Sequence, residues 1–310
     1  MNFLLLAALL PTLFWDKAPD TADQLRKSGI TVIAVPAANE PAWRSQPGFT
    51  VRAENFDGVI KLITPGVAYR ANEASATRSP WVSQNGWQYL RNPKGRFHLS
   101  ANGPASALAA AEAFLYGGNA VVQTDAAGLD PLGQMLAFLS QVTPSDMPPL
   151  ADIGFIDDGS AEAAEAMNLM ARKNLMFRIV AKPDPKLTLN VPFGSAKYPK
   201  SEAANPAAFA QKIRGDLTDE RRSFRIYGSE IVLGRLQSDG QRLRVHLLNY
   251  AGAARPVPGI RVRVRGHFTK HEIKAAGAPG IALQELHAGT EFTEFTIPEM
   301  KTYAVVDLMR

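Results

Sequence analysis

The chain has 310 residues, 46% hydrophobic and 20% charged, a composition typical of a folded protein of two or three domains rather than a disordered one. It contains no cysteine, which excludes disulfides, thiolate metal ligands and cysteine nucleophiles. The net charge of +5 resides at the C-terminal end, where residues 221–310 hold 14 Lys and Arg against 8 Asp and Glu. This modest excess, with no long basic tract, does not predict a nucleic-acid partner.

The apolar N-terminal run, residues 1–10, has two interpretations. It has the length of an export signal, which would place the protein outside the cell or in the periplasm, although no Lys or Arg precedes it. It can equally be a buried segment leading into the first strand. Pro11 interrupts the run, which is too short to span a bilayer, so we expect no membrane span.

The first part of the chain alternates between strand and helix patterns. The helix at 19–28 has Pro19 near its start and Gly29 just past its end. The continuous apolar strand after it predicts burial on both faces, as in a parallel sheet. The predicted elements are a helix at 19–28, strands at 30–35, 59–63 and 80–82, a helix at 105–116, a strand at 120–123 and a helix at 132–142.

Residues 143–149, rich in proline, form the best linker in the chain. A second α/β unit follows, with a strand at 152–156, a helix at 160–173, a strand at 175–180 and a last helix at 206–217. Beyond residue 221 short alternating strands joined by Gly and Pro turns predict an antiparallel β-sandwich. These strands are predicted at 231–236, 243–248, 260–264, 267–273, 292–297 and 303–308.

Acidic residues recur just past the strand-like runs. Asp16 and Asp125 both follow strands of the first unit, and Asp157 follows a strand of the second. Polar groups at the carboxyl ends of parallel strands line the ligand crevice of such folds. Asp16 and Asp125 are therefore the candidate carboxylate pair for acid–base catalysis, with Glu40 and Glu73 in loops that could reach the same edge. The alternative for each aspartate is a helix N-cap.

All four tryptophans fall within the first 90 residues, near these acids. Trp15, Trp43, Trp81 and Trp87 could stack on sugar rings, and Asn85 could hydrogen-bond their hydroxyl groups. Core packing for the tryptophans and a turn for Asn85 are the alternatives. Other chemistries lack their motifs: no HExxH, GxSxG, GxGxxG or P-loop pattern occurs, so no metal and no cofactor is expected.

The strand at 260–264 and its neighbours alternate arginine with apolar residues. Arg261, Arg263 and Arg265 would share one face, which Arg242 and Arg244 could extend on a neighbouring strand. Three interpretations stay open: a face that meets an acidic partner, including the chain's own α/β part, a face that binds an anionic polysaccharide, or a solvated face with glutamate opposite arginine.

This order of parts resembles that of β-galactosidase-type glycoside hydrolases. The segment Arg244-Val245-His246-Leu247-Leu248-Asn249-Tyr250 is similar to a strand of their last domain, and Thr302-Tyr303-Ala304-Val305-Val306 to its closing strand. The resemblance implies a β/α barrel, an amidotransferase-like domain without its nucleophile, and a β-sandwich. A complete barrel takes about 250 residues, and only about 145 precede the linker. The chain therefore departs from this pattern, because its first part is too short for a complete barrel.

The sequence thus predicts an α/β plus all-β protein of three domains: an incomplete β/α barrel-like unit over 1–146, a flavodoxin-like unit over 147–222 and a β-sandwich over 223–310. The expected function is hydrolysis of a carbohydrate by a carboxylate pair. The alternative is a non-catalytic glycan-binding or assembly protein on a degenerate hydrolase scaffold. A carbohydrate is the expected partner, and a homo-oligomer stays open.

Overall fold

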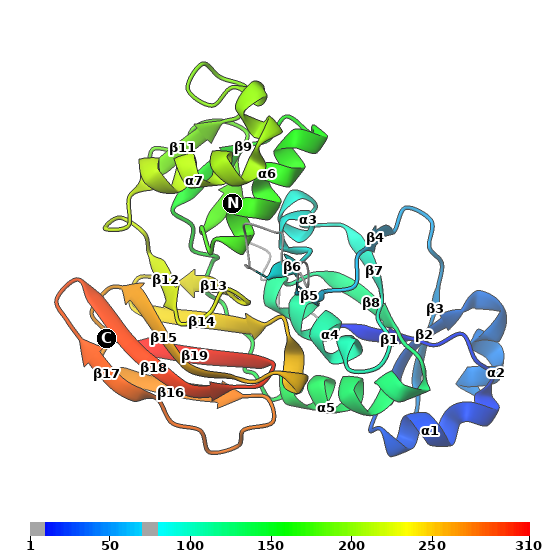
Figure 1. Cartoon of the computed structure of the whole chain (residues 1–310). Coiled ribbons are helices and arrows are strands. Elements are labelled where there is room, and N and C mark those ends of the chain that lie inside the picture. Colours follow the sequence, from blue (N-terminus) through cyan, green and yellow to red (C-terminus); the bar gives the residue numbers. More distant parts are fainter. Residues whose placement is uncertain (1–9, 70–79) are drawn as a thin grey trace.

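The computed structural model describes residues 10–69 and 80–310. Figure 1 shows three groups of sheets: a parallel sheet in the N-terminal part, a smaller parallel sheet in the middle of the chain, and two antiparallel sheets at the C-terminal end. The expected mixture of parallel α/β structure with antiparallel sheets is confirmed. The N-terminal segment 1–9 and Glu73 lie outside the described residues.

The first sheet has six strands in the order β3-β2-β1-β8-β7-β4, and every described neighbour pair is parallel. Its strands are β1 (Thr12–Phe14), β2 (Val32–Pro36), β3 (Thr50–Glu54), β4 (Ile60–Leu62), β7 (Arg96–Ser100) and β8 (Asn119–Gln123). The helices of this part are α1 (Ala22–Lys27), α2 (Glu40–Arg44), α3 (Gly86–Arg91), α4 (Ala105–Tyr116) and α5 (Leu129–Ser140). A short antiparallel pair, β5 (Gly66–Ala68) and β6 (Trp81–Ser83), adjoins them.

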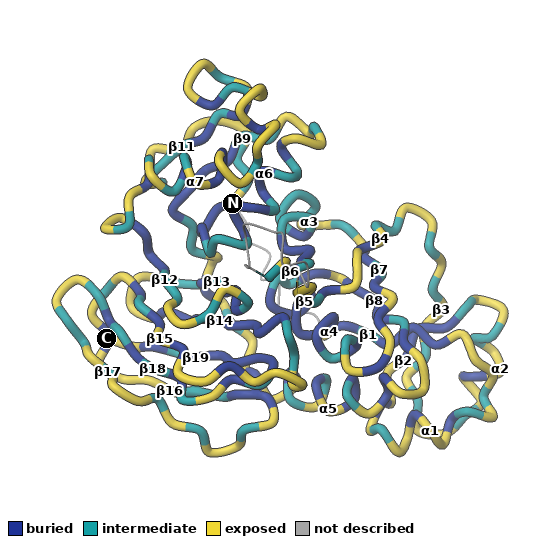
Figure 2. The backbone as a smooth tube through the Cα atoms, viewed as in Figure 1, coloured by how far each residue is buried: buried dark blue, intermediate teal, exposed yellow. Residues whose placement is uncertain are grey.

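The two faces of this parallel sheet differ. Leu13, Ile33 and Val122 are in register on neighbouring strands and point into the core that α4 and α5 cover. Residues one position along the strands, such as Phe14 and Val121, form a smaller cluster on the opposite face. The alternation follows from the two-residue period of a strand. Figure 2 shows the inner strands β1, β2 and β8 as largely buried, whereas the edge strand β3 is not.

The middle part is a three-stranded parallel sheet in the order β10-β9-β11 with two helices. Its elements are β9 (Ile153–Ile156), α6 (Ala161–Arg172), β10 (Phe177–Ile179), β11 (Leu189–Pro192) and α7 (Pro206–Leu217). Ser160 caps α6 by accepting a hydrogen bond from the Ala163 amide, and Asn205 caps α7 through the Ala208 amide. These caps explain why both helices begin where the sequence predicts.

The C-terminal part contains two four-stranded antiparallel sheets that share one hydrophobic core. The first sheet is formed by β12 (Phe224–Tyr227), β15 (Val257–Arg265), β18 (Phe292–Met300) and β17 (Gln284–Ala288). The second is formed by β13 (Val232–Ser238), β14 (Arg242–Asn249), β19 (Tyr303–Met309) and β16 (Lys270–Ala275). Arg242 and Arg244 lie on the second sheet, so they do not extend the arginine row of β15, contrary to the sequence prediction.

The second antiparallel sheet also packs against the first part of the chain. Its residues facing away from the shared core, Leu248, Tyr303 and Val305, belong to the hydrophobic cluster of the parallel sheet. The ring of Tyr303 contacts Phe114 of α4 and Phe138 of α5 edge-on, at centroid distances of 6.3 and 6.0 Å. The antiparallel sheet is thus joined to α4 and α5 by a continuous apolar core.

Candidate functional site

The pocket that includes the predicted acids lies where β1, β7 and β8 end. It has a volume of ≈ 370 Å³ and is lined by Asp16, Gln123 and Asp125 together with Trp15 and Asn102. Phe14 and Ser100 are each in register with Gln123, so the three strands end side by side. Both predicted carboxylates therefore lie at one pocket at the carboxyl edge of the sheet, where ligands of parallel α/β folds bind.

Asp16 and Asp125 are both exposed, and Asp16 is held by side chains. Its side chain is 40% exposed and pairs with the Nζ of Lys17 at 3.4 Å. The Gln123 side chain donates a hydrogen bond from Nε2 to Asp16 Oδ2 at 3.3 Å. These contacts hold the carboxylate without enclosing it, so a ligand in the pocket can reach it.

Asp125 is fixed by the backbone. Its Oδ1 accepts hydrogen bonds from the amides of Gly103 and Gly128, both at 2.9 Å, and the second bond caps the short helical turn 126–128. A side chain at Gly128 would come within 1.9 Å of Thr124 Oγ1, so glycine permits this close turn. The helix-capping role therefore accounts for Oδ1 of Asp125. Neither of the two backbone hydrogen bonds involves Oδ2.

A polar chain behind Asp16 was not foreseen from the sequence. Gln123 uses its Oε1 to contact Nε2 of His98 at 3.1 Å while its amide nitrogen reaches Asp16. Because the carboxylate requires a donor, Gln123 must present its oxygen to His98, whose Nε2 then carries hydrogen. Burial lowers the pKa of His98, whose ring contacts the rings of Phe14 and Phe56. Gln123 is the last residue of β8, and this position at the strand end is the sequence signal that could have indicated the polar chain.

The tryptophans near the acids are mostly core residues. Trp15 lines the pocket, is only 2% exposed, and donates from its indole to Thr21 Oγ1 at 2.9 Å. Trp43 is fully buried and donates to the Lys17 carbonyl at 2.9 Å, so its ring is closed to a ligand. Glu40 is on α2 and accepts two hydrogen bonds from Arg44, and it does not line the pocket.

The remaining predicted binding residues lie elsewhere, around β6 and α3. The guanidinium of Arg172 lies over the ring of Trp81 at 3.7 Å, and that of Arg91 over the ring of Trp87 at 5.5 Å. Asn85 is fully buried. The structure therefore brings Asp16, Asp125 and Trp15 together but does not place Trp81, Asn85 or Trp87 at their pocket.

Asn85 belongs to a buried polar cluster centred on Glu112 of α4. The carboxylate accepts hydrogen bonds from the Asn85 amide at 2.8 Å, from Asn85 Nδ2 at 2.7 Å and from the Tyr250 hydroxyl at 2.8 Å. Burial raises the pKa of Glu112 to about 7, although its three donors favour the charged form. Since Tyr250 follows β14, the cluster ties the antiparallel sheets to α4.

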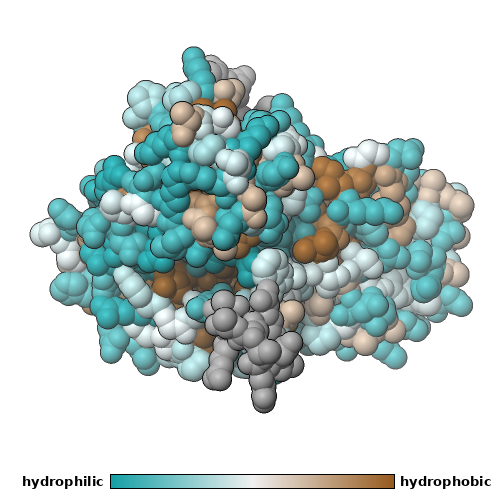
Figure 3. Space-filling view, turned by 45° about the horizontal axis from the view of Figure 1, so that its top comes forward, coloured by the Kyte–Doolittle hydropathy of each residue, from teal (hydrophilic) through white to brown (hydrophobic). Residues whose placement is uncertain are grey.

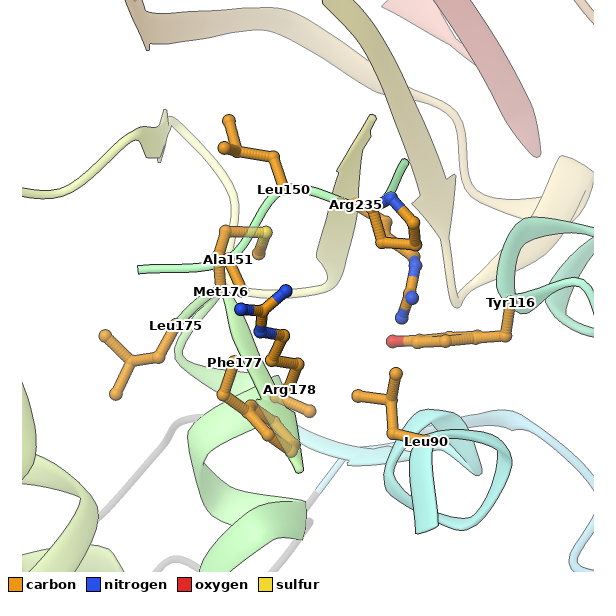
Figure 4. A pocket seen from close by; sticks show the side chains of 12 residues that line it. Leu90, Tyr116, Leu150, Ala151, Leu175, Met176, Phe177, Arg178 and Arg235 are labelled. Carbon is orange, nitrogen blue, oxygen red and sulfur yellow. The ribbon is translucent and has the colours of Figure 1, made fainter. Parts of the chain in front are cut away.

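A second cavity, of ≈ 30 Å³, lies where the three parts of the chain meet. Figure 4 shows Arg235 directed toward the ring of Tyr116, with Leu90 and Arg178 on other sides. The guanidinium of Arg235 lies 5.0 Å from the Tyr116 ring centroid. The volume suits one or two water molecules rather than a sugar. Figure 3 shows hydrophobic surface in the hollows between lobes, on an otherwise hydrophilic face.

Residues 10–69 and 80–310 contain neither a metal-binding cluster nor a helix that could span a membrane. Within these ranges no group of three or more His, Asp or Glu side chains is arranged to hold a metal ion. The same part of the chain has no helix with the length and apolar character that crossing a bilayer requires.

No family model and no curated protein matches the sequence. Among solved structures, the alpha-L-fucosidase isoenzyme 2 from Paenibacillus thiaminolyticus is similar, with a TM-score of 0.51 and 11% identity over 87% of this chain and 70% of that one. The fold resembles that of a glycoside hydrolase. A GH42 beta-galactosidase from G. stearothermophilus matches with a TM-score of 0.36 and 8% identity, over 96% of this chain and 60% of the other. The expected structural resemblance to glycoside hydrolases is confirmed.

Proposed function

We propose that this chain is a carbohydrate-active protein whose pocket at the ends of β1, β7 and β8 binds a sugar. The observation that carries the proposal is the meeting of Asp16, Asp125 and Trp15 at one pocket. Amide and hydroxyl side chains, among them Asn102 and Ser100, also line it, and such groups hydrogen-bond the hydroxyls of a sugar. The glycoside hydrolase-like fold supports the same ligand class.

The proposal includes a finer architecture. The open six-stranded parallel sheet would be an incomplete β/α barrel, the three-stranded sheet a flavodoxin-like unit, and the two antiparallel sheets a β-sandwich. Barrel enzymes place their sites at the carboxyl ends of the strands. A pocket at this edge is therefore the expected place for a sugar even where strands of the barrel are absent.

Hydrolysis by the pair Asp16 and Asp125 is the first mechanism. One carboxyl group would protonate the glycosidic oxygen while the other attacks the sugar or activates water. Asp125 is held by two backbone amides, so it suits the role of the fixed carboxylate, which acts as the nucleophile or as the base. Asp16, exposed at the same pocket, would then take the remaining role, that of the proton donor.

Non-catalytic glycan binding is the second candidate. The observation that favours it is the capping role of Asp125, because a carboxylate retained for the helical turn 126–128 needs no catalytic explanation. The ion pair of Asp16 with Lys17 likewise gives that acid a structural contact.

Turnover of a panel of glycosides, including α-L-fucosides and β-galactosides, separates the two candidates. Hydrolysis predicts measurable turnover that falls by about 10²-fold or more in both Asp16→Asn and Asp125→Asn. Asp125→Asn keeps a side-chain oxygen for the cap, so the fold should persist. Asp23→Asn, an exposed aspartate on α1 outside the pocket, is the matched control and should leave turnover unchanged. Binding without turnover by the native chain would favour the second candidate, and neither binding nor turnover would contradict both.

A further inference from the structure

The outer face of the β12-β15-β18-β17 sheet bears a row of arginines that the proposed pocket does not use. Arg225 on β12 lies opposite Arg263 on β15, which lies opposite Glu294 on β18. Arg261 and Arg265 lie two residues either side of Arg263, on the same face. We call Arg225, Arg261, Arg263 and Arg265 the arginine face.

The N-terminal α/β part does not pack on this face. The sheet that packs against α4 and α5 is the other one, through Leu248 and Tyr303. That sheet also uses its own arginine internally, because Arg244 forms a two-bond ion pair with Asp307. On the arginine face, by contrast, the Arg261 side chain is 59% exposed. The face is therefore not docked on the N-terminal α/β part, and its edge meets the middle part where Arg265 contacts the Arg221 carbonyl.

Only Arg261 and Arg263 of this face form direct ion pairs within the described part of the chain. Glu285, Glu220 and Asp152 act electrostatically, at longer range, on Arg261, Arg225 and Arg265 respectively. Glu294 pairs with Arg261 and also lies 3.3 Å from Nε of Arg263, so one carboxylate serves two guanidinium groups. Arg225 and Arg265 have longer contacts with neutral oxygens, the Tyr227 hydroxyl and the Arg221 carbonyl, both at 3.5 Å. The Glu294 arrangement shows how the face holds a carboxylate, and the two outer arginines can hold further ones.

An aromatic ring stands beside these cations. Tyr227 is in register with Arg261 and is 42% exposed, although tyrosine rings are usually more buried than that. An exposed ring next to guanidinium groups offers a sugar an apolar surface for its C–H face and cations for its acidic group. A solvated face needs no such ring.

We propose that the arginine face and Tyr227 bind an anionic polysaccharide, one whose sugars carry carboxylate groups. A uronic acid polymer has one carboxylate per acidic sugar, which matches a face with only a small excess of arginine. Double-stranded nucleic acid carries a charge about every 1.7 Å and calls for a larger basic surface. The inference concerns a site distinct from the strand-end pocket and does not depend on the proposed function.

Affinity electrophoresis through gels containing polygalacturonate tests this proposal, with neutral dextran as the uncharged comparison. The native chain should be retarded by polygalacturonate, less so at higher salt, and not by dextran. The double variant Arg225→Gln/Arg265→Gln should bind about 100-fold more weakly, at about tenfold for each charged contact. Tyr227→Ala, which keeps every charge, should also weaken binding. The variant Asp16→Asn/Asp125→Asn should bind like the native chain.

The matched control is Arg26→Gln/Arg44→Gln, which removes the same charge from α1 and α2. Retention of its binding, with circular dichroism unchanged in every variant, supports a specific face. Absence of retardation of the native chain would overturn the proposal. So would equal losses in the two double variants, which would indicate net charge alone. Equally tight binding of duplex DNA that Tyr227→Ala does not weaken would indicate a general polyanion surface instead of a saccharide site.

Discussion

The fold shifts the pKa of Glu112 in a direction that can be tested. Burial raises its pKa to about 7 from the ordinary value of 4.5, and the fold therefore prefers the neutral acid. Its stabilising contribution is complete below pH 4.5 and is lost as the pH rises through about 7, where both folded and unfolded chains ionise. We expect the free energy of unfolding to fall by roughly 3 kcal/mol between pH 4.5 and pH 8 from this group.

Urea unfolding at these two pH values, in the native chain and in Glu112→Gln, measures the effect. The variant should be less stable at low pH, because an amide cannot match all three donors, but its stability should depend less on pH. Glu162→Gln, an exposed site on α6, should retain the native pH dependence. An unchanged pH dependence in Glu112→Gln would contradict the assignment.

Single residues also mark the limit of what the sequence predicts. The order of a strand followed by an acid was enough to predict that Asp16 and Asp125 lie at one pocket, because the direction and period of a strand follow from the local sequence pattern. It was not enough for Gln123 and His98, whose contact joins residues on adjacent strands. Trp15 and Trp43 are both buried, yet only Trp15 lines the pocket, a tertiary property that composition does not carry.

At the scale of elements, α3 is fastened to the end of β9 by one buried ion pair. Arg91 donates two hydrogen bonds to the Asp157 carboxylate, each at 2.7 Å, and a third to the Ser160 carbonyl. Both side chains are largely buried, at 19% and 10% exposed. Arg91→Met should therefore destabilise the chain by about 3 kcal/mol, because it leaves the carboxylate buried without its cation.

A double-mutant cycle with Asp157→Asn, measured by urea unfolding, tests how much this ion pair, called the clamp below, contributes to stability. The double variant should cost clearly less than the sum of the two single variants, because each single change leaves the other charge unpaired. Arg214→Met, whose pair with Asp219 is 39% exposed on both sides, is the comparison and should cost under about 1 kcal/mol. Additive costs for Arg91 and Asp157 would show that the clamp contributes nothing.

Elements with strong local signals were predicted closely. The alanine-rich helix α4 has the predicted bounds, ending at Gly117, which adopts a positive φ of 66°. Strands β3 and β7 were missed, because charged residues such as Arg52 and Arg96 interrupt their apolar pattern. In the folded chain both arginines pair with Glu54 on one face of the sheet, which only the assembled sheet could reveal.

At the scale of the whole molecule, the docking of the antiparallel sheets was beyond sequence reasoning. Both sheets alternate apolar and polar residues, so each has an inner face, but only one also buries its outer face. The sheet with the buried outer face is the one that contains Tyr303 and Leu248, whose side chains belong to the same core as α4 and α5. Part of the positive charge of the C-terminal end then lies in the arginine face, whose residues do not line the carboxylate pocket.

The most direct test of the central claim follows the four indole N–H signals by nuclear magnetic resonance while a glycan library is added. If the strand-end pocket binds a sugar, the Trp15 signal shifts with a saturable dependence on ligand. The signal of Trp43, closed inside the core, stays fixed. Asp16→Asn/Asp125→Asn should weaken the Trp15 shift. A glycan that moves Trp81 or Trp87 while Trp15 stays unchanged would contradict the account, because binding would then lie at β6 and α3 instead.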